Sequence, residues 1–279
     1  MSDTNGRNHV YHADAQLHQL CLDIPLKHEG NHTSTKLPES GGYYSEQSAS
    51  YSAEGVVAYR CAYTRVAGNK DPKPGHGWAT LCTTVIEGLN IMEVLTADRI
   101  VGQISTEHPL DGYVPSISFL GTRFENLRIA GHPVSLDLDL DILGTTPAGD
   151  QSYGVDGGVV TRVGNQYRRL QDKVGQPGEV ADKYNQLSSA LGGREAVECS
   201  LVNHAAGGYP GHSYGHVIHV PNFGIIELAK VEITHGEFSD SGNPKVTCVK
   251  LTMLDLKFGC MITGKGGIGI GSTNGQTRP

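Results

Sequence analysis

The feature that most constrains the fold is a dense run of β-branched and other apolar residues at positions 78–105, WATLCTTVIEGLNIMEVLTADRIVGQIS, broken by Gly88. Such side chains suit a pleated, half-buried surface, and an internal glycine marks a bend or bulge. The run therefore predicts two or three successive strands. At positions 136–142 leucine or isoleucine alternates with aspartate, and this period of two predicts a strand with one buried face.

The rest of the chain favours the same fold class. Glycine contributes 37 of the 279 residues and tyrosine 12, a composition typical of short strands joined by tight turns. A helix is predicted at positions 179–191 (EVADKYNQLSSAL), where Gly192-Gly193 provides a stop. We therefore expect a mainly β protein, either a β-sandwich or a short solenoid-like stack of strands, with one helical insertion near 165–192.

The domain organisation is predicted from a change in polarity. Residues 1–54 are polar and hold five of the 13 histidines, which favours an N-terminal arm with one short strand at about 20–25. Residues 55–279 are predicted to form a single β-rich domain.

Charge and hydropathy exclude several partners. The net charge is −7 and the longest basic pairing is Arg168-Arg169, so nucleic-acid binding is not expected. No apolar run reaches the length of about 18 residues that a membrane helix needs. The first residues lack the basic and apolar regions of a signal peptide, which predicts a cytoplasmic location; an exported or surface location remains open if a leader was removed.

The six cysteines are widely spaced, without a CxxC motif. We expect buried free thiols, with disulfides as the alternative in an exported protein.

Two glycine motifs resemble catalytic or nucleotide-binding signatures. Residues 211–215 (GHSYG) fit G-x-S-x-G, which makes Ser213 a candidate nucleophile of a serine hydrolase. The flanking loop and following strand differ from the strand–turn–helix context that this motif requires. Residues 264–269 (GKGGIG) fit G-x-G-x-x-G, but the chain ends too soon for the helix of a dinucleotide-binding fold.

Three histidines close to one another form the best metal-binding candidate. His212, His216 and His219 have the residue type that binds zinc, iron or manganese, so a divalent metal is a candidate cofactor. In a single strand His216 and His219 would face opposite sides, which opposes joint ligation. Glu227 or the Glu107-His108 pair could complete such a site. The alternative is that these histidines lie in a solvent-exposed loop.

Three stretches resemble a known family in order and spacing: TTVIEGLNIMEVLTADRIVGQIS, FENLRIAGHPV and VPNFGIIELAKVEI. They are similar to the β-rich domain of bacterial choice-of-anchor P proteins. The resemblance covers about half of the chain, residues 55–143 and 215–272. It implies a secreted or surface β domain without established catalysis, and it assigns no functional residues.

Two classes of function are therefore predicted. The first is a non-catalytic binding or structural surface protein with an unidentified protein or small-molecule partner, for which homo-oligomers are one option. The second is an enzyme using the His-rich loop 204–219, either with a metal or through Ser213.

Overall fold

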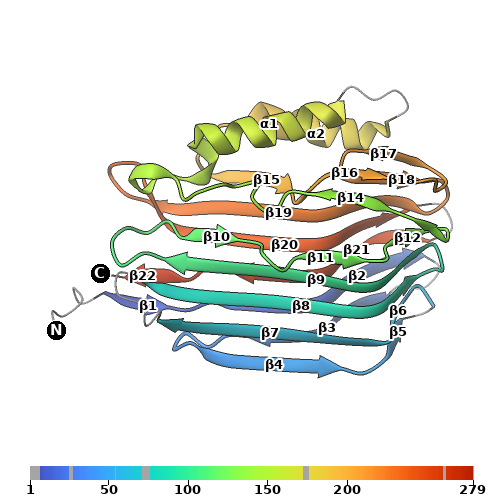
Figure 1. The fold of residues 1–279 in the computed structure, drawn as a ribbon, viewed down its shortest axis with the longest axis horizontal. Coiled ribbons are helices and arrows are strands. Elements are labelled where there is room, and N and C mark those ends of the chain that lie inside the picture. The colour runs from blue at the N-terminus through green and yellow to red at the C-terminus, as the bar shows by residue number, and fades with distance from the viewer. Residues whose placement is uncertain are drawn as a thin grey trace.

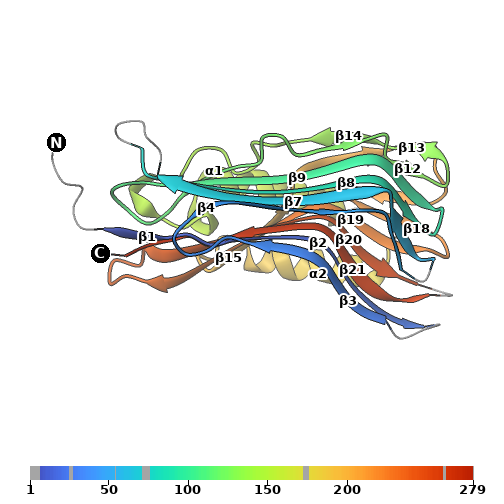
Figure 2. The ribbon, with the colours of Figure 1, turned by 90° about the horizontal axis from the view of Figure 1, so that it is seen from below.

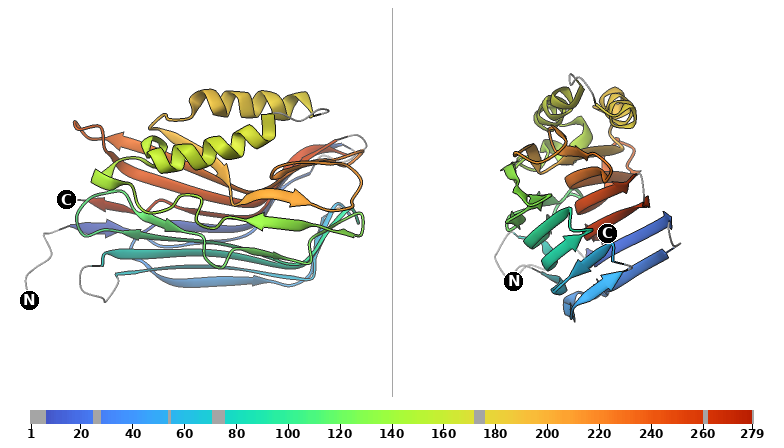
Figure 3. Two further views of the ribbon diagram at one scale, coloured as in Figure 1. Left: turned by 45° about the horizontal axis from the view of Figure 1, so that its top comes forward. Right: turned by 90° about the vertical axis from the view of Figure 1, so that its right-hand side faces the viewer.

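The computed structural model describes residues 7–24, 28–53, 55–70, 76–171, 176–259 and 262–278. Two antiparallel sheets lie face to face in a β-sandwich-like arrangement, and two helices lie along one edge of the sandwich (Figures 1 and 2). Both ends of the described chain lie at the same end of the sandwich (Figure 3). The mainly β prediction is confirmed.

The front sheet, which faces the viewer in Figure 1, has the order β13-β12-β9-β8-β6-β5, with β7 and β4 continuing from β8 and with β10 and β11 also paired to β9. Its strands are β4 (Gly42–Ser48), β5 (Tyr51–Ala53), β6 (Val57–Tyr59), β7 (Cys61–Lys70), β8 (Trp78–Ile91), β9 (Leu95–His108), β10 (Ser116–Ser118), β11 (Arg123–Glu125), β12 (Arg128–Ile129) and β13 (His132–Pro133).

The back sheet has the order β17-β18-β19-β20-β21-β2-β3, with β15 also paired to β19. Its strands are β2 (Ala13–Ile24), β3 (His28–Lys36), β15 (Ala196–Ser200), β17 (His212–Tyr214), β18 (Val217–Val220), β19 (Gly224–Phe238), β20 (Pro244–Phe258) and β21 (Thr263–Thr273). Two small pairs complete the β structure: β1 (Asn8–Val10) with β22 (Gln276–Arg278), and β14 (Ser135–Leu138) with β16 (Val202–Ala206).

The sheets approach each other closely where one of them carries glycine. A Cβ atom at Gly102 of β9 would lie 2.8 Å from Cγ of Met253 in β20, and one at Gly271 of β21 would lie 2.9 Å from Sγ of Cys82 in β8. Large and small side chains therefore alternate across the interface, which is how interiors reach crystal-like density. The glycines of the G-x-G-x-x-G motif belong to β21, a central strand of the back sheet.

The four central strands of the back sheet share an irregularity in one transverse row. Strict alternation of burial fails in this row, because neighbouring residues are both buried: Leu228 and Ala229, Met253 and Leu254, Ile268 and Gly269, Leu17 and His18. Ala229 and Gly269 have φ values of 44° and 66°. Because all four strands change face in the same row, the pairing stays in one register on both sides. Such irregularities bend a sheet, and the strands are visibly bent in Figure 2.

The N-terminal region differs from the predicted arm. Residues 8–53 supply β1 to β5, and β2 lies inside the back sheet between β21 and β3. Its buried face is built from small and apolar residues, including Ala13, Ala15 and Leu20. Polar residues alternate with them along the strand, and this lowered the mean hydropathy of a segment that is nonetheless central.

The helical region is also larger than predicted. α2 (Gly178–Ala190) lies where a helix was expected, and it follows α1 (Gly157–Gln171), which begins before the expected insertion. α1 buries Val159, Val163, Tyr167 and Leu170, the spacing of one helix face. Within the described residues, no helix is long and apolar enough to cross a membrane. The five cysteines that the structure describes are free; Cys260 lies outside the described residues.

Candidate functional site

A groove of about 700 Å³ lies between α2 and the outer face of the back sheet. Val180 and Lys183 of α2 form one wall, and Ile225, Lys257 and Lys265 of three adjacent strands contribute to the floor. The lining is mostly apolar, with charged groups at several points. Its volume falls in the range of about 300–1,000 Å³ that is typical of small-molecule sites.

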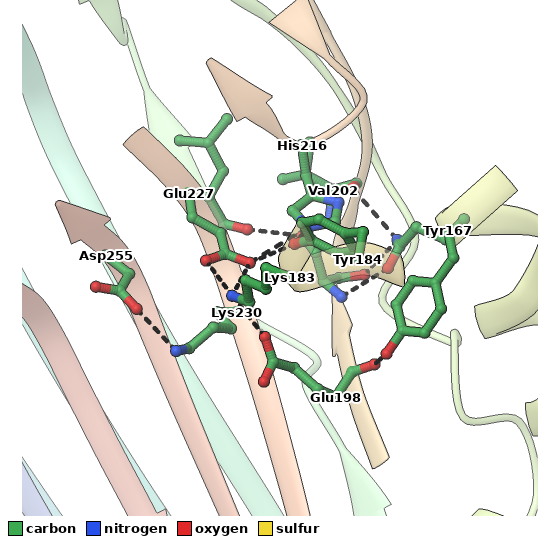
Figure 4. Close-up of polar contacts among 12 residues, drawn as sticks. Tyr167, Lys183, Tyr184, Glu198, Val202, His216, Glu227, Lys230 and Asp255 are labelled. Atoms are coloured by element: carbon green, nitrogen blue, oxygen red, sulfur yellow. Dashed lines mark hydrogen bonds and ion pairs between the residues drawn. The ribbon is translucent and has the colours of Figure 1, made fainter. Parts of the chain in front are cut away.

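A buried polar cluster closes the inner side of this groove (Figure 4). Nζ of Lys183 lies 2.7 Å from Oε2 of Glu227 and 2.7 Å from Oε1 of Glu198. Glu198 belongs to β15 and Glu227 to β19, so this one ammonium group ties α2 to two strands of the back sheet. The pair joins a half-buried lysine to two largely buried carboxylates and so connects the helix to the sheet.

Tyr184, next to Lys183 on α2, connects the cluster to a histidine. Its hydroxyl donates to Oε1 of Glu227 and lies 2.5 Å from Nε2 of His216. Because a tyrosine hydroxyl has one proton, His216 must donate its Nε2–H to Tyr184. Nδ1 of His216 is buried and has no hydrogen-bond partner among the described residues.

The charges of the cluster follow from these contacts. Burial alone would raise the pKa of the Glu227 carboxyl, but the His216 ring and the Lys183 ammonium outweigh it and hold that pKa well below its usual range. Burial would lower the pKa of Lys183, whereas Glu227 and Glu198 raise it above its usual value. Burial and the nearby Glu227 carboxylate raise the pKa of Tyr184 far above its usual value. The ion pair is therefore charged at neutral pH, and Tyr184 acts as a neutral hydrogen-bond donor.

A second ion pair lies beside the first one. Nζ of Lys230 lies 2.8 Å from Oδ2 of Asp255, and Asp255 is opposite Glu227 on the neighbouring strand. Burial would lower the pKa of Lys230, but its contact with Asp255 raises it well above its usual value. Each of the two adjacent carboxylates therefore has its own lysine.

α1 stabilises the same region from the other side. The side-chain amide of Gln166 donates to the carbonyl oxygen of Ser200 at 2.9 Å and accepts from the Ser200 backbone N–H at 2.8 Å. The hydroxyl of Tyr167 donates to the backbone carbonyl of Glu198 (Figure 4). Both helices thus hold β15 and the chain after it in place.

The histidines predicted as metal ligands are only partly brought together. His212 and His219 lie opposite each other in the β17–β18 hairpin, whereas His216 lies at the turn and points inward to Tyr184. Across the described ranges, no group of three or more His, Cys, Asp or Glu side chains could hold a metal ion. His212 and His219 therefore lack a third ligand from the described residues, and the metal role of His212, His216 and His219 stays a prediction.

Ser213 lies in the same hairpin, and its hydroxyl donates to the carbonyl oxygen of Gly215 at 3.2 Å. The local context is a strand, a tight turn and a second strand, which differs from a nucleophile elbow. No hydrogen bond to a histidine is present at this serine among the described contacts.

Of the groups considered as completing a histidine site, one does reach His216. Oε1 of Glu227 lies 3.5 Å from Nε2 of His216. His108 instead packs against His9, with ring centroids 4.7 Å apart. Sequence reasoning missed Lys183, Tyr184 and Glu198. The available signal was the apolar face of α2, where Tyr184 follows Val180 by four residues and is buried with it.

Comparison with protein families identifies the relatives of this chain. Residues 9–234 match the model of the Domain of unknown function DUF8256, which is more than half of the sequence. The chain belongs to the DUF8256 family. A comparison with curated proteins gives no match. The matched region contains both helices and the whole Lys183–Tyr184–Glu198–His216–Glu227 cluster, whereas Lys257 and Lys265 of the groove floor lie beyond it.

Proposed function

We propose that this protein is a non-catalytic binding protein whose small-molecule ligand occupies the groove between α2 and the back sheet. The observation that carries the proposal is the groove itself, a hollow of about 700 Å³ with a mostly apolar lining. Sites of this kind bury most of a small ligand and use a few polar groups to orient it.

The polar cluster supports binding over catalysis. The hydroxyl of Tyr184 and the carboxylate of Glu227 are both engaged with other side chains, so neither is free to take a proton from a ligand. The raised pKa of Tyr184 keeps this phenol protonated at neutral pH. The cluster therefore acts as the rigid support of the groove wall.

The ligand-binding proposal is tested by filling the groove. Ile225 is half-buried on the floor, and Ile225→Trp places a larger side chain in the hollow. Leu120→Trp, at a position 69% exposed next to the front sheet, is the matched control. We expect native mass spectrometry with a diverse set of small metabolites to reveal compounds that bind the wild type and Leu120→Trp but not Ile225→Trp. Failure of the whole set to bind the wild type, or equal binding by Ile225→Trp, would contradict the proposal.

An enzyme using the His-rich loop is the second candidate, and the observation in its favour is the contact of His216 with Glu227. The serine version predicts that a fluorophosphonate probe labels the wild type and not Ser213→Ala. The metal version predicts about one zinc, iron or manganese ion per chain, lost in His212→Ala. Absence of both signals would leave the binding protein as the working function. The surface role that the choice-of-anchor P resemblance implies stays a prediction.

A further inference from the structure

The groove floor carries two lysines that face each other. Lys257 of β20 and Lys265 of β21 are directly opposite in the strand register, and both line the groove. Side chains at such positions have Cβ atoms about 5 Å apart, and like charges placed there destabilise the sheet. The repulsion between the two lysines lowers the stability of the sheet, and a negatively charged group bound at the floor would offset it.

The protein itself supplies only part of that negative charge. Nζ of Lys257 contacts the Glu179 carboxylate of α2, and both side chains are largely exposed at 61% and 46%. Lys265 forms no ion pair with any other described residue, including Asp23, which also lines the groove. An exposed pair such as Lys257–Glu179 contributes little and is easily rearranged.

The deeper carboxylates do not compete for these lysines. Glu227 is bound by Lys183, and Asp255 is bound by Lys230 at 2.8 Å. Their charges are therefore compensated within the protein. Among the described residues, the lining charges without an ion pair are Lys265 and the exposed Asp23, and only Lys265 lies opposite a second cation in the strand register.

Apolar surface lies directly beside the two cations. Ile225 is opposite Lys257 in the register, on the side facing away from Lys265, and Val180 of α2 forms the adjacent wall. One row of the floor therefore runs from an aliphatic side chain to two ammonium groups. The lysine stems extend the apolar surface further.

We infer that the groove binds an amphipathic anion, with a carboxylate or phosphate head between Lys257 and Lys265 and an apolar body along Ile225 and Val180. The inference rests on the proposed binding function and specifies its ligand class. The ligand is a free small molecule, because the groove is walled by α2 and holds about 700 Å³. The head binds through charge-assisted hydrogen bonds and the body through burial of apolar surface.

The test compares three probes that share one tail. Decanoate, decyl phosphate and decanol are titrated into the protein below their micellar concentrations, at pH 7 and low salt, and binding is measured by isothermal titration calorimetry. We expect both anions to bind at least about tenfold more tightly than decanol, with the difference decreasing as salt is added. Lys265→Gln should weaken binding of both anions about tenfold and leave decanol unchanged. Lys245→Gln, an exposed lysine at the other end of β20, is the matched control and should change nothing.

The outcomes separate the ligand class from the groove itself. Equal affinity for decanol and decanoate, or no effect of Lys265→Gln on anion binding, would overturn the anion site. If the probes still bound the wild type in that case, and Ile225→Trp abolished their binding, the proposed binding function of the groove would remain intact. The inference would also be overturned if the protein sedimented with phosphatidylglycerol vesicles but did not bind dispersed decanoate, since the anionic head group would then belong to a membrane surface. Failure of all three probes, together with failure of the metabolite set, would overturn both proposals.

Discussion

Two histidines in this molecule are equally buried but have opposite surroundings, one polar and one aromatic. His216, under α2, and His108, at the end of β9, are each 1% exposed. His216 donates to Tyr184 and lies beside the Glu227–Lys183 ion pair. Neither ring nitrogen of His108 has a hydrogen bond of normal geometry to a described residue. Burial alone therefore does not define the state of a histidine; the groups around it do.

The surroundings of His108 are aromatic. The ring of His9 contacts those of His108 and Trp78, with centroids 4.7 Å and 5.2 Å away, and His9 is stacked on Trp78. Nδ1 of His9 lies 3.2 Å from Oγ1 of Thr277, in the β1–β22 pair that brings the two ends of the chain together. Burial, and to a lesser degree His9, lower the pKa of His108 to about 3, although the Gly275 backbone opposes the shift. Burial lowers the pKa of His9 to about 4.

The largest expected effect comes from removing the charge that compensates the His216 region. Lys183→Met keeps most of the side-chain volume but leaves Glu227 and Glu198 without their counter-ion. Because an uncompensated buried carboxylate is costly, we expect the free energy of unfolding to fall by about 3 kcal/mol. Urea unfolding followed by circular dichroism measures this change.

Lys257→Met is the matched control, since its partner Glu179 is largely exposed. That variant should cost less than about 1 kcal/mol. If the two substitutions had equal effects, the Lys183 cluster would not be the support of the groove wall that the structure indicates.

The second prediction concerns the other histidine and the dependence of stability on pH. Because the pKa of His108 is lowered on folding, the unfolded chain binds a proton that the folded protein resists at pH values between about 3 and 6.5. The contribution of the neutral His108 ring to the free energy of unfolding is therefore fully present above about pH 6.5 and is lost as the pH falls below that value. Between pH 7 and pH 5, His108 alone should reduce the free energy of unfolding by about 2 kcal/mol.

His108→Leu should remove this part of the pH dependence. The slope that remains comes from other histidines with lowered pKa values, including His9 and His235, both near 4. Glu227 adds to the loss only below about pH 4.5, because its pKa is lowered from the ordinary carboxyl value. Urea unfolding at a series of pH values measures both slopes. An unchanged slope in His108→Leu would show that this ring is protonated or hydrated in the folded protein.

The fold class was predictable from the sequence because the long strands carry their own signal. In β8 and β9 the β-branched residues and the alternation of burial are plain in the sequence. The same signal was hidden in β2, where His18 and Leu17 are buried in succession. This change of face breaks the period of two in β2. The three neighbouring strands change face in the same row, which keeps the pairing in register. That coincidence is visible only once the strands are placed in the sheet.

The candidate site was predictable only in part, for a related reason. The prediction selected the His-rich loop, and His216 does belong to the buried cluster. The other members of the cluster lie 11 to 33 residues from His216 in the chain, on a helix and two strands, so no local spacing links Lys183 to Glu198 and Glu227. The opposition of Lys257 and Lys265 likewise depends on the register of β20 with β21. Pairing between segments, more than residue type, creates these sites.

The smallest expected effect comes from replacing each of the two histidines, His216 and His108, by leucine. His216→Leu removes the donor to Tyr184 and should cost about 1–2 kcal/mol at pH 7, because the phenol oxygen loses a partner in a buried site. His108→Leu removes two buried nitrogens that have no hydrogen bond of normal geometry to a described residue, and it should stabilise the protein by up to about 1 kcal/mol at the same pH. Urea unfolding of the two variants side by side measures the difference in sign. Equal losses in both would mean that the His108 ring makes a contribution through packing with His9 and Trp78 that outweighs its unsatisfied nitrogens, and the contrast between the two sites would then be one of degree.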